Sequence, residues 1–148
     1  MATQSTLIPQ QQLIDAAKAS LLAFNEKNWD GVRTSVSADF VYDEVATSRK
    51  VQGVDQAIAV WQGWASAFPD ARATFHRELP SGNTVVFEVS WRGTHNGPLL
   101  TPEGAIAATG RRIDVRACMV VEVAEDKARV QCHYFDMGTL LRQIGATA

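Results

Sequence analysis

The stretch TVVFEVSWRG, residues 84–93, alternates apolar and polar side chains and decides the fold class of this chain. Alternation with a period of two is typical of a strand with one buried face. The apolar side of this predicted strand consists of Val85, Phe87, Val89 and Trp91. The same period returns between Ile113 and Val123, and a turn at residues 125–127 leads into residues 128–136. The second half of the chain therefore predicts an antiparallel meander.

Before this stretch the apolar residues follow a helical period instead. An amphipathic helix is predicted over residues 9–27, and a second short helix is predicted from Trp29. After Gly53 an apolar stripe at helical spacing predicts a helix that ends at Pro69. Helices followed by a run of long strands indicate an α+β fold.

We expect one domain over residues 1–148, with its core at about 10–145, because a chain of 148 residues that is 46% hydrophobic suits a single core. Residues 39–45 are rich in β-formers and predict a short strand, whereas the prolines and glycines of residues 95–108 predict a loop. Helices packed on one face of a curved antiparallel sheet form a cone. The apolar interior of such a cone suits a small molecule.

Composition and charge exclude several classes of partner. A formal charge of −2, without a stripe rich in Lys and Arg, offers no attractive field to a nucleic acid backbone. No apolar run is long enough to span a membrane and the first residues lack a signal-peptide pattern, so we expect a cytoplasmic protein. Cys118 and Cys132 are expected to be core thiols, and the histidines lack the spacing of metal ligands, so we expect no metal site.

The sequence HYFD, at the end of the last predicted strand, holds two candidate proton-transfer groups, His133 and Asp136. A turn at residues 125–126 would pair Met119 with Cys132. That register puts Asp136 at the end of an apolar stripe and His133 on the opposite face, unless a β-bulge re-aims the histidine. Asp136 also fits the N-cap of a final helix, which would lower its pKa, whereas an apolar cavity would raise it. Both interpretations stay open.

Three further polar residues are candidates for a ligand site. His95 lies on the Trp91 side of its strand, at the rim, where it would bind or protonate a polar group of a ligand. The alternative for His95 is a loop histidine bonded to the backbone. Tyr42 and Glu44 share one face of the first predicted strand and would add a donor and a carboxylate, although a partly exposed strand shows the same pattern.

Four segments of the chain occur in the order and spacing of SnoaL-like proteins; they are GVDQAIAVWQGWASAFPDARATF, VSWRGTHNGPL, ATGRRIDVRACMVVEV and HYFDMGTLLRQIG. Over roughly residues 10–145 the chain resembles this polyketide cyclase and ester cyclase branch of the nuclear transport factor 2-like superfamily. The resemblance implies a cone-shaped α+β fold with a deep pocket, a homodimer through the outer sheet face, and no metal or organic cofactor. It also implies relatives with different chemistry, ketosteroid isomerase and limonene-type epoxide hydrolases, so the fold does not choose the reaction.

In the cyclases an acidic residue on the last strand is thought to remove a proton from carbon next to carbonyl groups, and the enolate then closes a ring. Many relatives carry a carboxylate at the position that aligns with His133, and a second acidic residue three places later that matches Asp136. Many also have a histidine in the first strand, where this chain reads VYDEV. The alignment therefore favours His133 in the pocket, whereas alternation favours Asp136; the two would act together if a bulge turned the imidazole inward.

We expect a cofactor-independent enzyme of the lyase or isomerase class that performs cyclisation or isomerisation by proton transfer on a hydrophobic carbonyl compound. The expected catalytic residues are His133, Asp136 and His95. The expected substrate-binding residues are Tyr42, Glu44, Trp61, Trp64, Phe87, Trp91, Arg116, Met119 and Tyr134. Two alternatives stay open: hydrolysis of an epoxide by converging acidic groups, and non-catalytic binding of small apolar ligands.

Overall fold

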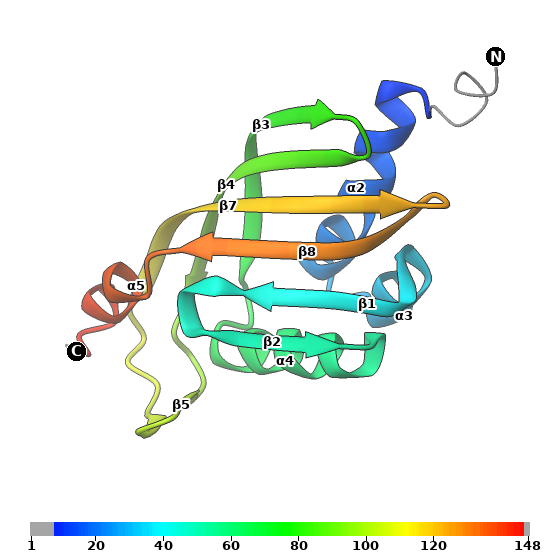
Figure 1. The fold of residues 1–148 in the computed structure, drawn as a ribbon. Helices are drawn as coiled ribbons and strands as arrows, with labels where there is room; N and C mark the ends of the chain where they lie inside the picture. The colour runs from blue at the N-terminus through cyan, green and yellow to red at the C-terminus, as the bar shows by residue number, and fades with distance from the viewer. Residues whose placement is uncertain (1–7, 147–148) are drawn as a thin grey trace, which may run out of the picture.

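In the computed structural model, which describes residues 8–146, helices cover one face of a curved sheet (Figure 1). The helices of the first half are α2 (Gln10–Asn25), α3 (Trp29–Ser35) and α4 (Val54–Ala67), with a short 3-10 turn, η1 (Val45–Thr47). The strands are β1 (Val36–Glu44), β2 (Arg49–Gln52), β3 (Arg72–Ser81), β4 (Thr84–Thr94), β5 (Leu99–Thr101), β6 (Gly104–Ile106), β7 (Arg112–Ala124) and β8 (Lys127–Phe135). A last helix, α5 (Met137–Gln143), follows β8 directly. The α+β fold predicted from the sequence is confirmed.

The predicted helices are present because their apolar stripes face the sheet. α2 buries Ala17, Leu21 and Phe24 on one side, and α4 buries Ile58 and Trp61. Burial of one stripe per helix supplies most of the stability of such short helices. The helices thus form the second wall of the interior.

The main sheet is mixed, with the strand order β2-β1-β8-β7-β4-β3. The meander of β3, β4, β7 and β8 is antiparallel as predicted, but β1 pairs with β8 in parallel. The prediction of a wholly antiparallel sheet is therefore wrong at this one pairing. Alternation reports which face of a strand is buried and carries no information on the direction of a neighbour that is distant in sequence.

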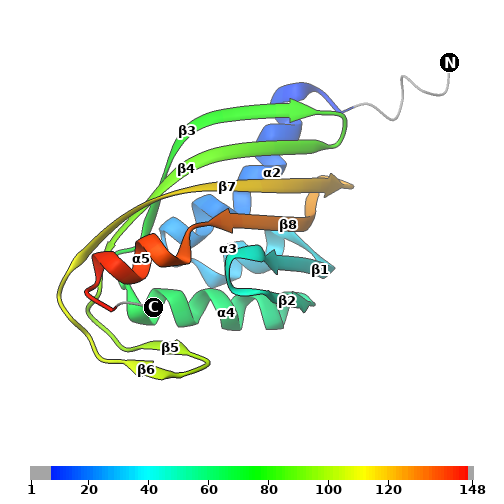
Figure 2. The same cartoon turned by 60° about the vertical axis from the view of Figure 1, so that its left-hand side comes forward.

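The predicted loop over residues 95–108 contains a small hairpin, β5–β6, in which Leu99 pairs with Ile106. The two prolines misled the prediction because neither occupies a paired position: Pro98 precedes β5 and Pro102 lies in the turn. Figure 2 shows that β4 and β7 bend around the helices toward the end of the molecule where this hairpin projects.

The register between β7 and β8 decides which residues face the interior. Glu125 and Asp126 form the two-residue turn, with left-handed φ angles of 52° and 63° that match the twist of a hairpin. The first two pairs follow the predicted register, but a bulge at Arg129 of β8, opposite Glu122 and Val123, shifts every later pair by one residue. Met119 then lies opposite His133 instead of Cys132.

A shift of one residue exchanges the two faces of a strand. His133 therefore joins the buried face, and the predicted inward placement of Asp136 is wrong. Cys118 and Cys132 lie half-buried on the outer, convex face, which corrects their prediction as core thiols. The homodimer expected through this convex face stays a prediction.

Candidate active site

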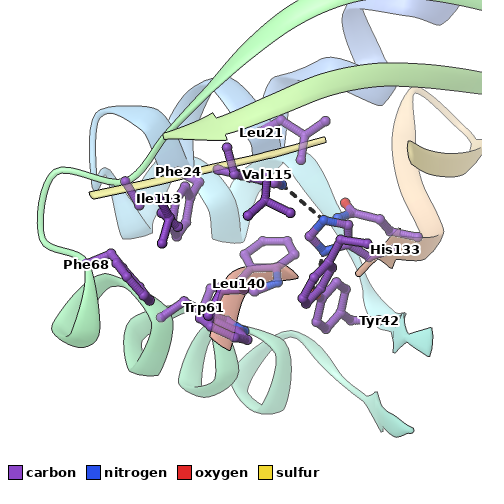
Figure 3. A pocket seen from close by; sticks show the side chains of 14 residues that line it. Leu21, Phe24, Tyr42, Trp61, Phe68, Ile113, Val115, His133 and Leu140 are labelled. Carbon is purple, nitrogen blue, oxygen red and sulfur yellow. Dashed lines mark hydrogen bonds between the residues drawn. The ribbon is translucent and has the colours of Figure 1, made fainter. Parts of the chain in front are cut away.

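An apolar cavity of about 70 Å³ lies between the helices and the concave face of the sheet (Figure 3). Its floor comes from β1, β4, β7 and β8, its roof comes from α2 and α4, and α5 adds Leu140. The side chains that line it are Leu21, Phe24, Tyr42, Trp61, Trp64, Phe68, Ala71, Trp91, Ile113, Val115, Gln131, His133, Phe135 and Leu140. Within this lining set only Tyr42 and His133 titrate, so any acid–base chemistry in the cavity starts from them.

His133 is held by hydrogen bonds at both ring nitrogens. Its Nε2 accepts a hydrogen bond from the indole Nε1–H of Trp91 at 3.1 Å, so Nε2 carries a lone pair and no proton. Its Nδ1 lies 2.8 Å from the phenol oxygen of Tyr42. With Nε2 unprotonated, the neutral ring carries its proton on Nδ1 and donates it to Tyr42.

The phenol of Tyr42 extends this chain to a carboxylate. Its O–H donates to Oε2 of Glu44 at 2.7 Å, which leaves the phenol oxygen free to accept from His133. Figure 3 shows Tyr42 and His133 side by side at one end of the cavity, with Phe68 and Ile113 at the other end. A continuous path of hydrogen bonds therefore runs from Trp91 through His133 and Tyr42 to Glu44.

Glu44 has no exposed surface but is fully hydrogen-bonded. Trp64 Nε1 donates to the same Oε2 at 2.8 Å; Thr47 and Arg49 donate to Oε1 at 2.6 and 2.9 Å. Burial alone would raise the pKa of this carboxyl group, but the hydrogen bonds from Thr47 and Tyr42, with the charge of Arg49, lower it below its usual value. Glu44 is therefore an ionised carboxylate one layer behind the cavity wall.

Burial sets the protonation of the two groups in the wall. Burial raises the pKa of Tyr42, and the negative charge of Glu44 raises it further, so the phenol stays protonated. Burial lowers the pKa of His133 to about 4, against a smaller opposing effect from Glu44. At neutral pH the site thus holds a neutral imidazole, a neutral phenol and an ionised carboxylate.

The structure brings several of the predicted site residues together. Among the predicted catalytic residues, His133 lies in the cavity wall. The predicted substrate-binding residues in the wall are Tyr42, Trp61, Trp64 and Trp91. Glu44 joins them through its hydrogen bonds to Tyr42 and Trp64.

Asp136 lies outside the cavity as the exposed N-cap of α5. Its carboxylate accepts from the backbone N–H of Gly138 at 3.0 Å and from the hydroxyl of Thr139 at 2.7 Å. The bond from Thr139, together with that from Gly138, lowers its pKa. Of the two roles that the sequence allowed for Asp136, the structure shows the N-cap of α5.

Other predicted site residues also lie elsewhere. Arg116 and Tyr134 alternate onto the convex face, where they border a shallow groove with Asp136, and 45% of Tyr134 is exposed. Phe87 and Met119 point inward but are fully buried core residues that do not line the cavity. The one-residue bulge explains Tyr134, whereas Arg116 follows the alternation of β7.

His95 is buried where the chain leaves β4 and does not itself line the cavity. Its ring packs against Phe68 at 5.3 Å between centroids, and its Nδ1 lies 2.9 Å from the hydroxyl of Thr109. Its backbone pairs with Arg111 and Gly110, so this histidine anchors the base of the hairpin segment. That arrangement corrects its expected position at the pocket rim.

Sequence reasoning missed Gln131, a polar residue of the cavity wall. Gln131 and His133 are two residues apart on β8, so they share a face. Once the bulge is known, Gln131 and His133 form a polar pair on a buried face, and this identifies both as candidate site residues. Without it, the apolar Val130 and Cys132 are the residues that appear to face the core.

Within residues 8–146 no helix is long and apolar enough to cross a bilayer. In the same described part of the chain, no three His, Cys, Asp or Glu side chains gather closely enough to hold a metal ion.

The model of the SnoaL-like polyketide cyclase family matches residues 14–144, and the chain belongs to this family. Its fold is the ketosteroid isomerase-like, or nuclear transport factor 2-like, fold. Membership of this family indicates an enzyme of the cyclase or isomerase type that acts on a small molecule. Among curated proteins no sequence match was found.

Three solved structures illustrate the likeness. A protein from Jannaschia sp. CCS1, assigned as a SnoaL-like polyketide cyclase, has a TM-score of 0.82 at 18% identity, over 94% of this chain and 95% of its own. IdmH from Streptomyces antibioticus, assigned as a polyketide cyclase, has a TM-score of 0.77 at 23% identity, over 91% and 99%. An LEH-like epoxide hydrolase from M. tuberculosis has a TM-score of 0.70 at 19% identity, over 91% and 90%. At these identities the likeness shows the fold alone.

Proposed function

We propose that this chain is a cofactor-independent cyclase or isomerase that moves a proton on a hydrophobic carbonyl compound, with His133 as the base. One observation carries the proposal: the cavity wall holds a neutral imidazole that is linked through the phenol of Tyr42 to the ionised carboxylate of Glu44. The rest of the lining is almost entirely apolar and suits the carbon skeleton of such a compound.

His133 uses Nε2 as the base, because Nδ1 already carries a proton. Transfer of a proton from the carbon next to a carbonyl group to Nε2 yields an enolate and an imidazolium ion. The imidazolium keeps its Nδ1–H bond to Tyr42, and Tyr42 keeps its bond to Glu44, so the new positive charge is connected to a carboxylate. General base catalysis of this kind contributes about 10²–10⁴-fold to a rate.

Trp91 completes the site by serving two successive acceptors. While Nε2 of His133 is unprotonated, it accepts a hydrogen bond from the indole N–H of Trp91. Once protonated, Nε2 is itself a donor, so this hydrogen bond breaks and the indole N–H is free. In the same step the substrate oxygen gains negative charge. The indole N–H then stabilises the enolate oxygen, which is where a preorganised donor lowers a barrier most.

The enolate can react in two ways, and the site supports both equally. Attack of its carbon on a second carbonyl of the same molecule closes a ring, and the new alkoxide oxygen takes the proton back from His133. Return of that proton to a different carbon instead completes an isomerisation. Both require the same base and the same oxyanion donor. We therefore propose the shared proton-transfer step as the function. The structure of the substrate determines whether cyclisation or isomerisation follows.

Epoxide hydrolysis fits the cavity less well. It needs acidic groups that converge on a water molecule, but the described lining contains no carboxylate, Glu44 stands behind Tyr42, and Asp136 caps α5 on the outside. Incorporation of ¹⁸O from labelled water into a diol would establish that alternative. Plain ligand binding is the other alternative, and it predicts no proton exchange with any ligand.

Deuterium exchange tests the proposal directly. The protein is incubated in heavy water with 1-indanone, 2-tetralone and an aryl β-ketoester, and entry of deuterium is followed by mass spectrometry. We expect exchange above the enzyme-free rate, lost in His133→Ala and partly restored by added imidazole, which can occupy the space of the missing ring. Asp136→Asn is the matched control and keeps full exchange. Equal exchange by the wild type and His133→Ala would rule out His133 as the base.

A further inference from the structure

Gln131 places an unpartnered amide oxygen in the wall of the cavity. The residue is 1% exposed and lines the cavity two positions before His133 on the same face of β8. Its Nε2 donates to the sulfur of Met119 at 3.5 Å, and its Oε1 has no hydrogen-bond partner within the described residues. Because a thioether sulfur accepts but does not donate, this contact fixes the nitrogen on the Met119 side and leaves the carbonyl oxygen without a donor.

An amide in this position is costly unless something binds it. Buried polar groups in folded proteins are nearly always hydrogen-bonded, and a buried oxygen without a donor destabilises the fold. A leucine would fill a similar volume without that penalty. The other buried side-chain atoms without partners in the described residues, Ser20 Oγ, Ser37 Oγ and His95 Nε2, belong to residues outside the cavity lining. Gln131 alone combines the missing partner with a place in the wall.

We propose that Oε1 of Gln131 accepts a hydrogen bond from a hydroxyl or N–H group of the substrate and thereby selects donor-bearing ketones over plain hydrocarbon-substituted ones. Two residues along a strand span roughly 6–7 Å, so the substrate donor lies about that far from the carbon that faces His133. This inference rests on the proposed function for the reacting end of the substrate. The apolar remainder of the wall gives no comparable discrimination, because it recognises shape and not polarity.

A matched pair of small probes tests the inference without any turnover. 4-Hydroxyacetophenone carries a carbonyl and a hydroxyl at opposite ends of one ring, and 4-methylacetophenone replaces the hydroxyl by a methyl group of similar size. Their dissociation constants are measured by calorimetry for the wild type, for Gln131→Leu and for Gln52→Leu, an exposed glutamine of β2 that serves as the control. We expect the wild type and the control to prefer the hydroxyl probe by about three- to tenfold, the range of one net hydrogen bond.

Gln131→Leu separates a ligand-binding role from a structural one. We expect it to abolish the preference by weakening only the hydroxyl probe, while its thermal midpoint stays equal to that of the wild type or rises. A lowered midpoint with equal loss of both probes would show that Gln131 serves the fold. A preference that persists in Gln131→Leu, or no preference in the wild type, would overturn the inference. If the wild type shows no deuterium exchange but still prefers the hydroxyl probe, the proposed function is rejected and the inference about Gln131 is not.

Discussion

The indole Nε1–H of Trp91 donates a hydrogen bond to Nε2 of His133 over 3.1 Å and so occupies the nitrogen that must receive the substrate proton. The two residues come from β4 and β8, which are separated in the sheet by β7. This bond fixes the tautomer of the imidazole before substrate binds and keeps its lone pair satisfied. It must break during the reaction, and its breaking is what makes Trp91 available to the substrate.

Trp91→Phe removes this donor while it keeps an aromatic ring in the wall. We expect kcat for deuterium exchange to fall by about 10²–10³-fold, the usual cost of one oxyanion donor, with little change in KM. Steady-state exchange rates at saturating ketone measure the effect. Trp29→Phe removes an indole that does not line the cavity and should leave the rate unchanged. A rise in rate for Trp91→Phe would mean that the indole only blocks the base.

Glu44→Gln removes the charge that supports the imidazolium. The Glu44 carboxylate raises the pKa of His133, so its loss lowers that pKa further and weakens the base. We expect exchange to slow by roughly 10–100-fold, since a hydrogen bond to a charged group contributes about 1.5–3 kcal/mol and each 1.4 kcal/mol is a factor of about ten in rate. Glu78→Gln, at a surface ion pair with Lys18, is the matched control. Equal rates for Glu44→Gln and the wild type would place the carboxylate outside the mechanism.

The fall of the exchange rate at acid pH should report the pKa of the proposed base, His133. Because burial lowers the pKa of His133 to about 4, the imidazole is unprotonated throughout the neutral range. The exchange rate should therefore stay level from neutral pH down to about pH 5 and fall below it, because the pH dependence of kcat/KM follows the pKa of the essential base in the free enzyme. Initial rates in buffers of constant ionic strength measure this profile. A midpoint near the ordinary histidine pKa of about 6.5 would mean that the reacting histidine is solvated.

Stability should also depend on pH through His133. Unfolding restores its ordinary pKa of 6.5, whereas the folded state holds it at about 4. Between these values the unfolded chain binds a proton that the folded chain excludes, so stability falls as the pH drops from about 6.5 to 4, by roughly 3 kcal/mol at most. Urea unfolding at several pH values measures the slope. Replacement of His133 by Gln should reduce the slope; an equal slope in the wild type and in this variant would contradict the assignment.

Much of the fold was predictable because alternation and helical spacing report burial directly. The alternation of β7 identified all of its buried side chains, whereas the stripe of α4 missed the buried Ala57 and Ala67 and the alternation of β4 missed the buried Ser90. The direction of β1 was not predictable in this way, since a parallel and an antiparallel neighbour bury the same face. The short β5–β6 hairpin was hidden by prolines that stand next to its paired positions.

The site was harder to predict than the fold because its placement depends on one bulge. Val130 and Cys132 look like the buried residues of β8, and Gln131 and His133 look exposed, but the bulge reverses the two sets. A polar pair on a buried face contradicts the usual sorting of side chains, and such contradictions mark functional positions. Family alignment located His133 where alternation did not.

Substitutions at Asp136 and at His133 should have opposite effects on exchange and on thermal stability. Comparison of these effects tests the register between β7 and β8. Asp136→Asn keeps an oxygen that can cap α5, because asparagine is as good an N-cap as aspartate, so both exchange and thermal midpoint should match the wild type. Asp136→Ala loses the cap and should lower the midpoint while exchange persists. His133→Ala should lose exchange. Measurement of midpoint and exchange rate on the same three variants separates the roles: loss of exchange in Asp136→Asn would require the carboxylate to reach the cavity, which the bulge in β8 prevents.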